Sequence, residues 1–393
     1  MSNGSKREQI YQCGWLWQTG YYAKTKRKEE RGMREGWEYI CFESCLNKIP
    51  KAKQVKTKEY NSGTKYPIIS QEDKLISGYC DDESMLFHID KPVIIFGDHT
   101  RVLKYIDFDF VVGADGVKII SPKENLNAKF LLYFLTWYNI PNLGYSRHYK
   151  LLKELDIPVP PLSTQLSIVS ELDKINELIR LKREQLKDYD NLAQSIFYEM
   201  FGDPVVNEKG WIVKTIGDVC SLKSGDSKAN KSPKGTLPYV KVGDMNLPGN
   251  ENYITCSSTY VDRDYNKRGI FPIGSILFPK RGGAILTNKK RMAAVEICCD
   301  LNTMGVIPSE VLNKHYLFQW FKILDLGTIC SGSTILQLNN CDIAPLLIQI
   351  PPLTLQQTFA QRIELIEKQK AEIQSTIADL ETLLASRMQY WFD

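Results

Sequence analysis

The chain repeats itself once with an offset of 191 residues, and this repeat constrains the fold more than any other feature of the sequence. The run Ile157-Pro158-Val159-Pro160-Pro161-Leu162-Ser163 returns as Ile348-Gln349-Ile350-Pro351-Pro352-Leu353-Thr354. Three further residues match at the same offset: Gln165 with Gln356, Ser195 with Ser386, and Phe201 with Phe392. Upstream of them, Gly36-Trp37 recurs as Gly210-Trp211 at a shorter offset. One repeat of this length indicates a duplicated domain with a duplicated helix, whereas a solenoid repeats every 20–50 residues.

Each copy has the same succession of expected elements. Short β-branched or aromatic runs at 93–96 and 275–278 read as strands. Amphipathic helices are expected at about 128–138 and 314–324, and a long helix follows each Pro-Pro pair, where proline is tolerated. The predicted fold class is α+β: two similar mixed α/β domains separated by two long helices that form an antiparallel coiled coil, with an internal pseudo-two-fold axis.

The two long helices share one apolar seam with spacings of three and four residues, as a coiled coil requires. A single lysine interrupts each seam (Lys182 and Lys370), and such a break can fix register. The alternative is that each helix packs separately on its own domain. The predicted seam consists of Ile168, Leu172, Ile175, Ile179, Leu186, Tyr189, Phe359, Ile363, Ile366, Ile373, Ile377 and Leu380.

Duplex DNA is the ligand that best suits two similar domains on a rigid spacer. A helix of about 35 residues is about 50 Å long, and sites one helical turn apart on DNA lie about 34–36 Å from centre to centre. The whole chain carries a net charge of only +4, so basic loops must supply the attraction.

Basic and polar residues gather at matching places in the two copies. Residues 279–291 hold five basic side chains and no acidic one, beside glycines that let a loop approach a backbone closely. Taken alone, such a basic loop is usually just a solvated surface, and a structural salt bridge or helix cap explains Arg147-His148 equally well. The candidate DNA-binding residues are His99, Thr100, Arg101, Lys104, Ser146, Arg147 and His148 in the first copy, and Lys280, Arg281, Thr287, Asn288, Lys289, Lys290 and Arg291 in the second.

The sequence lacks the patterns that catalysis or metal binding would need. There is no phosphate-binding GxxxxGK[ST] loop, no Asn-Pro-Pro-Tyr-like methyltransferase motif, and no zinc-type spacing among ten cysteines and four histidines. No apolar run is long enough for a membrane helix or a secretion signal. We therefore expect a cytoplasmic, non-catalytic binding protein with no metal or cofactor of its own. A coiled-coil scaffold whose heads bind proteins, and a stand-alone DNA-modifying enzyme, remain alternatives.

Several of these features together resemble the specificity (S) subunit of type I restriction–modification enzymes. They are the helix entry at 157–165, the joint Met200-Phe201-Gly202-Asp203-Pro204, the Gly-Trp restart and Gly144-Tyr145-Ser146-Arg147-His148. The resemblance covers about residues 36–393. It implies target-recognition domains at 36–156 and 204–347 that each read half of a bipartite DNA site, and spacer helices at 157–203 and 348–393.

The same resemblance implies the partners. Two modification subunits would dock on the helices and bring S-adenosylmethionine chemistry, and restriction subunits would bring ATP- and Mg-dependent translocation and cleavage. Residues 1–35 precede the family's Gly-Trp start, and they read as an N-terminal extension, a part of the first domain or a helix that docks on the spacer.

Overall fold

The structure is a computed structural model that describes residues 34–50, 52–60, 63–114, 116–144, 146–226, 235–263, 269–332 and 335–393. The predicted N-terminal extension therefore lies almost wholly outside the described residues, as does Tyr145. None of the described helices is both long and apolar enough to cross a membrane.

The chain forms two compact units, and both long helices take part in both of them. Helix α3 (Leu162–Phe201) and helix α8 (Leu353–Phe392) have 40 residues each, five more than expected. The first unit extends to Glu184 and takes up Gln374–Asp393, and the second holds Gln185–Ile373. We call residues 34–161 the first head and residues 202–352 the second head.

The first head contains three small sheets and two helices. Strands β1 (Glu38–Cys41) and β9 (Asp156–Val159) form an antiparallel pair. Strands β2 (Tyr66–Ile69), β3 (Gly78–Cys80), β4 (Leu86–Phe87) and β7 (Phe110–Val112) make a sheet in the order β3-β2-β7-β4. Strands β5 (Val93–Gly97), β6 (Leu103–Ile106) and β8 (Val117–Ile120) make another in the order β6-β5-β8. Helices α1 (Ala128–Tyr138) and α2 (Tyr149–Lys153) follow.

The second head, like the first, begins and ends with a strand of one antiparallel pair and places its main helix after its sheets. Strands β10 (Ile212–Thr215) and β19 (Leu347–Ile350) are paired as β1 and β9 are. A five-stranded sheet has the order β11-β18-β15-β16-β13, and a smaller one has the order β14-β12-β17. Their bounds are β11 Cys220–Ser224, β12 Leu237–Val240, β13 Tyr253–Ile254, β14 Tyr260–Val261, β15 Ile276–Pro279, β16 Arg291–Ala293, β17 Cys298–Cys299 and β18 Thr303–Pro308. The helices are α4 (Ile216–Val219), α5 (Lys314–Ile323), α6 (Leu326–Ile329) and α7 (Asn340–Ile343).

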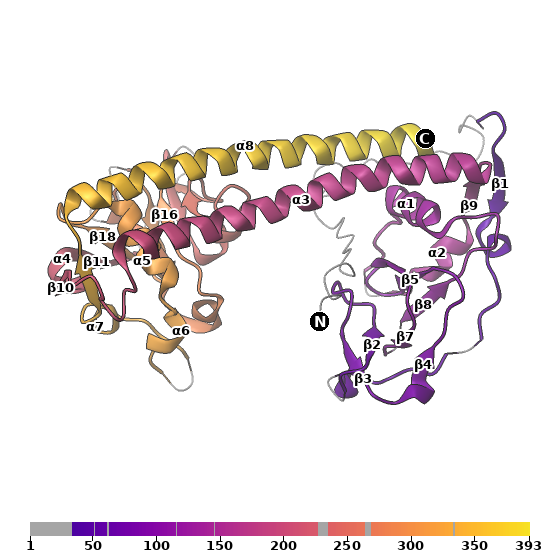
Figure 1. Ribbon diagram of the computed structural model, residues 1–393, viewed down its shortest axis with the longest axis horizontal. Coiled ribbons are helices and arrows are strands. Elements are labelled where there is room, and N and C mark those ends of the chain that lie inside the picture. Colours follow the sequence, from indigo (N-terminus) through magenta and orange to yellow (C-terminus); the bar gives the residue numbers. More distant parts are fainter. Residues whose placement is uncertain are drawn as a thin grey trace. The chain divides into compact units, whose positions relative to one another are not determined.

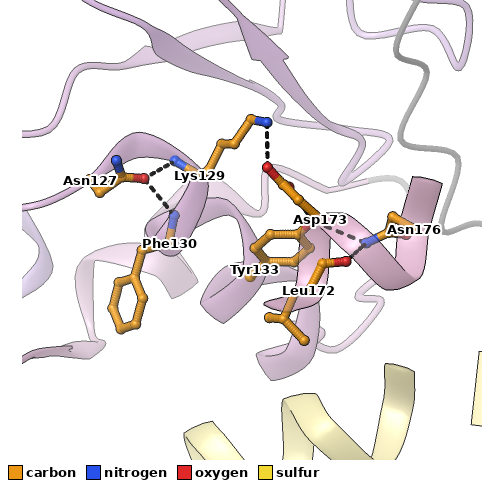
Figure 2. Close-up of polar contacts among 7 residues, drawn as sticks. All are labelled: Asn127, Lys129, Phe130, Tyr133, Leu172, Asp173 and Asn176. Carbon is orange, nitrogen blue, oxygen red and sulfur yellow. Dashed lines mark hydrogen bonds and ion pairs between the residues drawn. The ribbon is translucent and has the colours of Figure 1, made fainter. Parts of the chain in front are cut away.

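An asparagine forms the N-cap of the main helix in each head. The Asn127 side chain accepts hydrogen bonds from the amides of Lys129 and Phe130 and caps α1 (Figure 2). Asn313 caps α5 in the same way, through the amide of His315. Asparagine is a favoured N-cap because its oxygen satisfies amides that have no partner within the helix. The prediction of a helix at 128–138 is confirmed, and α5 ends one residue earlier than expected.

Within each unit, α3 and α8 run antiparallel and bury the predicted seam. In the first unit, Glu171 is paired with Arg387, and Arg183 with Glu381 at 2.6 Å. In the second unit, Lys370 lies 2.8 Å from Asp190. Of the predicted seam residues, Leu186, Tyr189 and Leu380 are half-buried and the rest are buried: Ile168, Leu172, Ile175, Ile179, Phe359, Ile363, Ile366, Ile373 and Ile377. The predicted antiparallel coiled coil is confirmed by this pairing (Figure 1).

The C-terminal end of each long helix contributes a phenylalanine to an aromatic cluster in one head. Phe392, at the end of α8, packs against Phe130, Phe134 and Trp137 with ring centroids 5.5–5.8 Å apart. Phe201, its match in the repeat, packs against Tyr316 at 4.7 Å and Phe359 at 5.3 Å. Each head is therefore held by the beginning of one long helix and the end of the other.

A polar network also joins the first head to its long helix. Asp173 on α3 accepts hydrogen bonds from Lys129 and Tyr133 on α1, each at 2.7 Å, and Asn176 donates to Tyr133 at 3.0 Å (Figure 2). His315 and Glu364 hold the matching places in the second unit, 3.5 Å apart. Burial and the neighbouring Lys314 lower the pKa of His315, while Glu364 opposes the shift. The α1–α3 contact therefore rests on a charged pair, and its counterpart rests on a histidine whose neutral form is favoured.

Candidate nucleic-acid interface

Two loops cross at one point in the first head. One is the turn between β5 and β6, and the other is the loop that connects α1 to α2. The backbone amide of His148 donates to the carbonyl of Asp98 at 2.8 Å, which fastens the loops together. The loop that follows the helix is thereby held against a hairpin far earlier in the chain.

The second head repeats this crossing with different residues. The amide of Leu338, in the loop between α6 and α7, donates to the carbonyl of Lys280 at 2.9 Å, and the amide of Gly282 donates to the carbonyl of Leu336 at 2.8 Å. Lys280 follows β15 as Asp98 follows β5, and both strands pair with the strand that leads into the head's main helix. The segments after β5 and β15, which the repeat predicted to be equivalent, therefore occupy equivalent positions in the two heads.

His148 is a structural residue at this crossing. Its side chain is fully buried, Nε2 accepts a hydrogen bond from the amide of Leu143 at 3.0 Å, and Nδ1 lies 2.9 Å from the Asp98 carbonyl oxygen. A nitrogen that accepts from an amide carries no proton, so the ring is neutral and Nδ1 donates. The buried Asp98 carboxylate accepts from the amide of Tyr149 at 2.8 Å. The prediction that His148 offers a donor to DNA is not supported, because both of its nitrogens are occupied inside the head.

Two of the predicted basic residues bind the C-terminal ends of helices instead. Arg101 donates through Nη1 to the carbonyl of Ile140 at 2.9 Å, just beyond α1. Lys290 donates to the carbonyl of Leu324, the C-cap residue of α5. Helix C-termini carry unpaired carbonyls and a partial negative charge, which attract cations. Burial lowers the pKa of Lys290 to about 8.

Two further predicted residues hold an earlier loop in each head. Lys104 donates to the carbonyls of Ser70 at 2.8 Å and Lys74 at 2.5 Å. Arg291 reaches the carbonyl of Met245 through Nε at 3.3 Å and Nη2 at 3.2 Å. Burial lowers the pKa of Lys104 to about 8 and also lowers that of Arg291. Lys104 and Lys290 are buried, so they are internal cross-links and not exposed phosphate contacts.

The remaining predicted residues lie at or beside the crossings. Arg147 and Arg281 are exposed. Among the others, Thr100 donates to the carbonyl of Gln71 at 2.7 Å, Lys280 to Ser224 at 2.9 Å, Thr287 to the carbonyl of Ala284 at 2.6 Å, and Lys289 to Asn246. Asn288 has a left-handed backbone with φ +53° and accepts from the amide of Leu326. His99 and Ser146 are half-buried beside the first crossing.

Some residues of the interface could not be recognised from sequence. Gln71 lies far from the hairpin in the chain, yet its side chain accepts from the amide of His99 at 3.3 Å. Leu286 and Ile335 are more than half exposed on the two loops of the second head, and Leu143 is 46% exposed in the first. A leucine in a loop carries no sign of exposure in the sequence, so only the structure places these side chains on the surface.

No group of three or more metal-ligating side chains occurs among the described residues. Each head instead presents two loops that are hydrogen-bonded to each other and that carry glycines and an exposed arginine. Such loops suit recognition of a large anionic surface. The fold and these loops define a duplicated two-headed binding protein with a coiled-coil connection.

The comparisons with known proteins identify the family. The family model described as "Type I restriction modification DNA specificity domain" matches residues 34–188 and 208–382, one copy on each half of the repeat. This chain belongs to that family.

Named relatives agree with this membership. The MjaIX specificity subunit of a type I restriction enzyme from Methanocaldococcus jannaschii is 27% identical over 291 residues, which is 64% of this chain and 66% of the relative. The EcoR124I/EcoR124II specificity subunit from Escherichia coli is 25% identical over 289 residues, 67% of this chain and 69% of the relative.

Solved structures show the same fold. The S subunit of a type I restriction–modification system from M. genitalium has a TM-score of 0.53 at 13% identity, over 90% of this chain and 96% of that one. A chain from a structure of complex assembly and conformational transition in a type I system has a TM-score of 0.53 at 18% identity, over 92% of this chain and 99% of that one.

Proposed function

We propose that this chain is the sequence-specific DNA-recognition subunit of a type I restriction–modification complex, in which each head reads one half of a bipartite site. The observation that carries the proposal is the repeated loop crossing, at His148–Asp98 in one head and Leu338–Lys280 in the other. The family model matches each half separately. Two equivalent reading surfaces in one chain suit two half-sites.

The coiled coil would set the distance between the half-sites. Each long helix has 40 residues, or about 60 Å at 1.5 Å per residue. The two helices are paired antiparallel inside each unit, and a paired connection would resist bending more than a single helix. We propose that this length fixes the number of base pairs between the two half-sites.

Matched exposed leucines support docking of two copies of one partner. Leu192 on α3 and Leu383 on α8 are equivalent in the repeat, and each is 45% exposed. Leu162 and Leu353 form a second equivalent pair, 47% and 41% exposed. Exposed apolar side chains at repeated positions suit repeated protein contacts. We propose that two modification subunits bind there and that methylation, with S-adenosylmethionine, is their chemistry.

The chain itself would be non-catalytic and would act in the cytoplasm, with restriction subunits supplying ATP- and Mg-dependent cleavage. The alternative of a scaffold whose heads bind only proteins is not favoured, because the family is defined by DNA specificity. The other alternative, a stand-alone DNA-modifying enzyme, differs in its expected behaviour: the purified chain would methylate or cut DNA without partner subunits.

The test is to map methylated bases in DNA treated with this chain and its modification subunits. The expected result is one bipartite motif, with binding that weakens steeply as salt increases because phosphate contacts release counterions. Exchange of residues 36–156 for another recognition domain should change one half-site only. A motif without two separated halves, or methylation by the chain alone, would overturn the proposal.

A further inference from the structure

An exposed arginine stands beside the loop crossing in each head. Arg147 immediately precedes His148, whose amide makes the crossing bond to Asp98. Arg281 immediately follows Lys280, whose carbonyl accepts the crossing bond from Leu338. Each arginine is therefore the direct neighbour of a residue whose backbone is held by a hydrogen bond between two loops.

The two arginines come from opposite loops of their crossings. Arg281 lies on the hairpin and forms a β-bridge with Gln337 of the other loop. Arg147 lies on the loop after the helix, in the place that Gln337 holds in the second head. Each crossing therefore has one exposed arginine, but the two arginines are not at equivalent positions of the repeat.

Their surroundings separate these arginines from the other basic residues of the loops. Arg101, Lys104, Lys290 and Arg291 are bound to backbone carbonyls inside their heads. Arg147 and Arg281 are exposed, and within the described part of the chain neither guanidinium has a hydrogen-bond or ion-pair partner. The internal cross-links hold the loops, and the two arginines remain available to a ligand.

Glycines beside both arginines leave room for DNA to approach. Gly144 has φ +72° and Gly282 has φ +69°, a conformation that favours glycine. A Cβ atom added at either glycine would meet no heavy atom within 4 Å, so open space lies beside the backbone. The backbone at each glycine is therefore open to a ligand on that side.

We infer that Arg147 and Arg281 are specificity-determining residues, each of which reads a guanine in the major groove of its own half-site. The inference rests on the proposed function. Arginine binds O6 and N7 of guanine with two hydrogen bonds, the commonest base-specific contact of proteins on DNA. A loop whose backbone is already fixed loses less conformational entropy on binding, so more of the energy of such a contact is retained. Head exchange alone would not reveal which residues read which base.

The experiment uses the reconstituted complex with its modification subunits and compares Arg147→Gln with Arg281→Gln. Each variant should relax one G·C position in one half-site, with a loss of about ten- to hundredfold in binding to the parent site. The other half-site, and the remaining positions of the altered half-site, should stay unchanged, and the latter shows that the altered head is folded. Arg263→Gln, which breaks an exposed ion pair with Glu296 in the second head, is the control and should leave the motif intact.

A base analogue gives a second readout. Replacement of the assigned guanine by 7-deazaguanine, which lacks the N7 acceptor, should weaken the unaltered complex but not the matching glutamine variant. Equal weakening on all sequences with a smaller salt dependence would mean a phosphate contact and overturn the inference. Half-sites without G·C pairs, or an unchanged motif, would also overturn it. If the unaltered complex gives no bipartite motif, the proposed function itself fails.

Discussion

Gln165 makes in the first unit the same set of hydrogen bonds that Gln356 makes in the second. Gln165 accepts from the amide of Asn127 at 2.8 Å and donates to the carbonyls of Asn125 and Pro160. Gln356 accepts from the amide of Asn313 at 2.8 Å and donates to the carbonyls of Val311 and Pro351. One buried glutamine therefore joins the start of a long helix to the start of its head's main helix.

Removal of either glutamine should loosen one head and spare the other. Gln165→Ala leaves buried backbone groups without partners, at a cost of about 2–4 kcal/mol. Hydrogen exchange should show faster exchange at Asn127 and along α1, whereas Gln356→Ala should act at Asn313 and along α5. The exposed Gln194→Ala on α3 is the control and should change neither. Equal effects on both heads would contradict the assignment of each glutamine to one unit.

The lysine in the seam of α8 should be dispensable for stability. Lys370 is buried between Asp190 and Glu367. Burial, and after it repulsion by Lys370, lowers the pKa of the half-buried Lys322. Lys370→Leu removes the buried charge and leaves only the more exposed carboxylates of Asp190 and Glu367, so the free energy of unfolding should change by less than about 1 kcal/mol. Replacement of both Asp190 and Glu367 by alanine should instead lower it by about 2 kcal/mol, because the buried charge loses its partners. Denaturant unfolding compares the two. A destabilised Lys370→Leu variant would show that the charge contributes more than it costs.

The buried Lys104 should make stability depend on pH in the alkaline range. Burial lowers its pKa to about 8 from an ordinary value of 10.5, and the nearby Glu72 and Asp73 only partly oppose this. Between these two values the unfolded chain binds more protons than the folded chain, so stability rises with pH. From pH 7.5 to 9.5 the unaltered chain should gain about 2 kcal/mol relative to Lys104→Met. Chemical unfolding at both pH values measures this. A constant difference between the two proteins would mean that Lys104 keeps an ordinary pKa.

The repeat and the heptads predicted the larger architecture because they depend on spacing along the chain. The offset of 191 residues led to two heads, and the seam led to antiparallel helices, both of which the structure has. The helix lengths were underestimated, since α3 and α8 begin directly after proline and continue to Phe201 and Phe392.

The candidate site was predicted less well because charge in a loop does not reveal what the charge binds. Arg101 and Lys290 look like phosphate contacts in the sequence, but carbonyls at the ends of α1 and α5 lie within their reach and hold them. Those carbonyls come from residues 39 and 34 positions away. Only folding brings them close, so no local pattern could separate these cations from the exposed Arg147 and Arg281.

The matched leucines should each account for one modification subunit. Leu192→Asp or Leu383→Asp places a charge in an apolar contact, so each variant should bind one subunit fewer, and the double variant should bind neither. Native mass spectrometry of the complex counts the subunits. Leu365→Asp is the control, because Leu365 is exposed but its repeat partner is Lys174. Normal stoichiometry in the double variant would place the docking surface elsewhere.

Lengthening the coiled coil should lengthen the DNA spacer. One heptad inserted after Glu184 in α3 and another after Ile373 in α8, where the two compact units meet in sequence, keeps the apolar seam in phase because both helices gain seven residues. The added rise is about 10 Å, or about three base pairs at 3.4 Å each. Methylation mapping should return both half-sites unchanged with a spacer about three base pairs longer. Insertion in α3 alone puts the two seams out of register, so the same assay should show a loss of methylation. An unchanged spacer in the double insertion would mean that the helices do not set the distance between the half-sites.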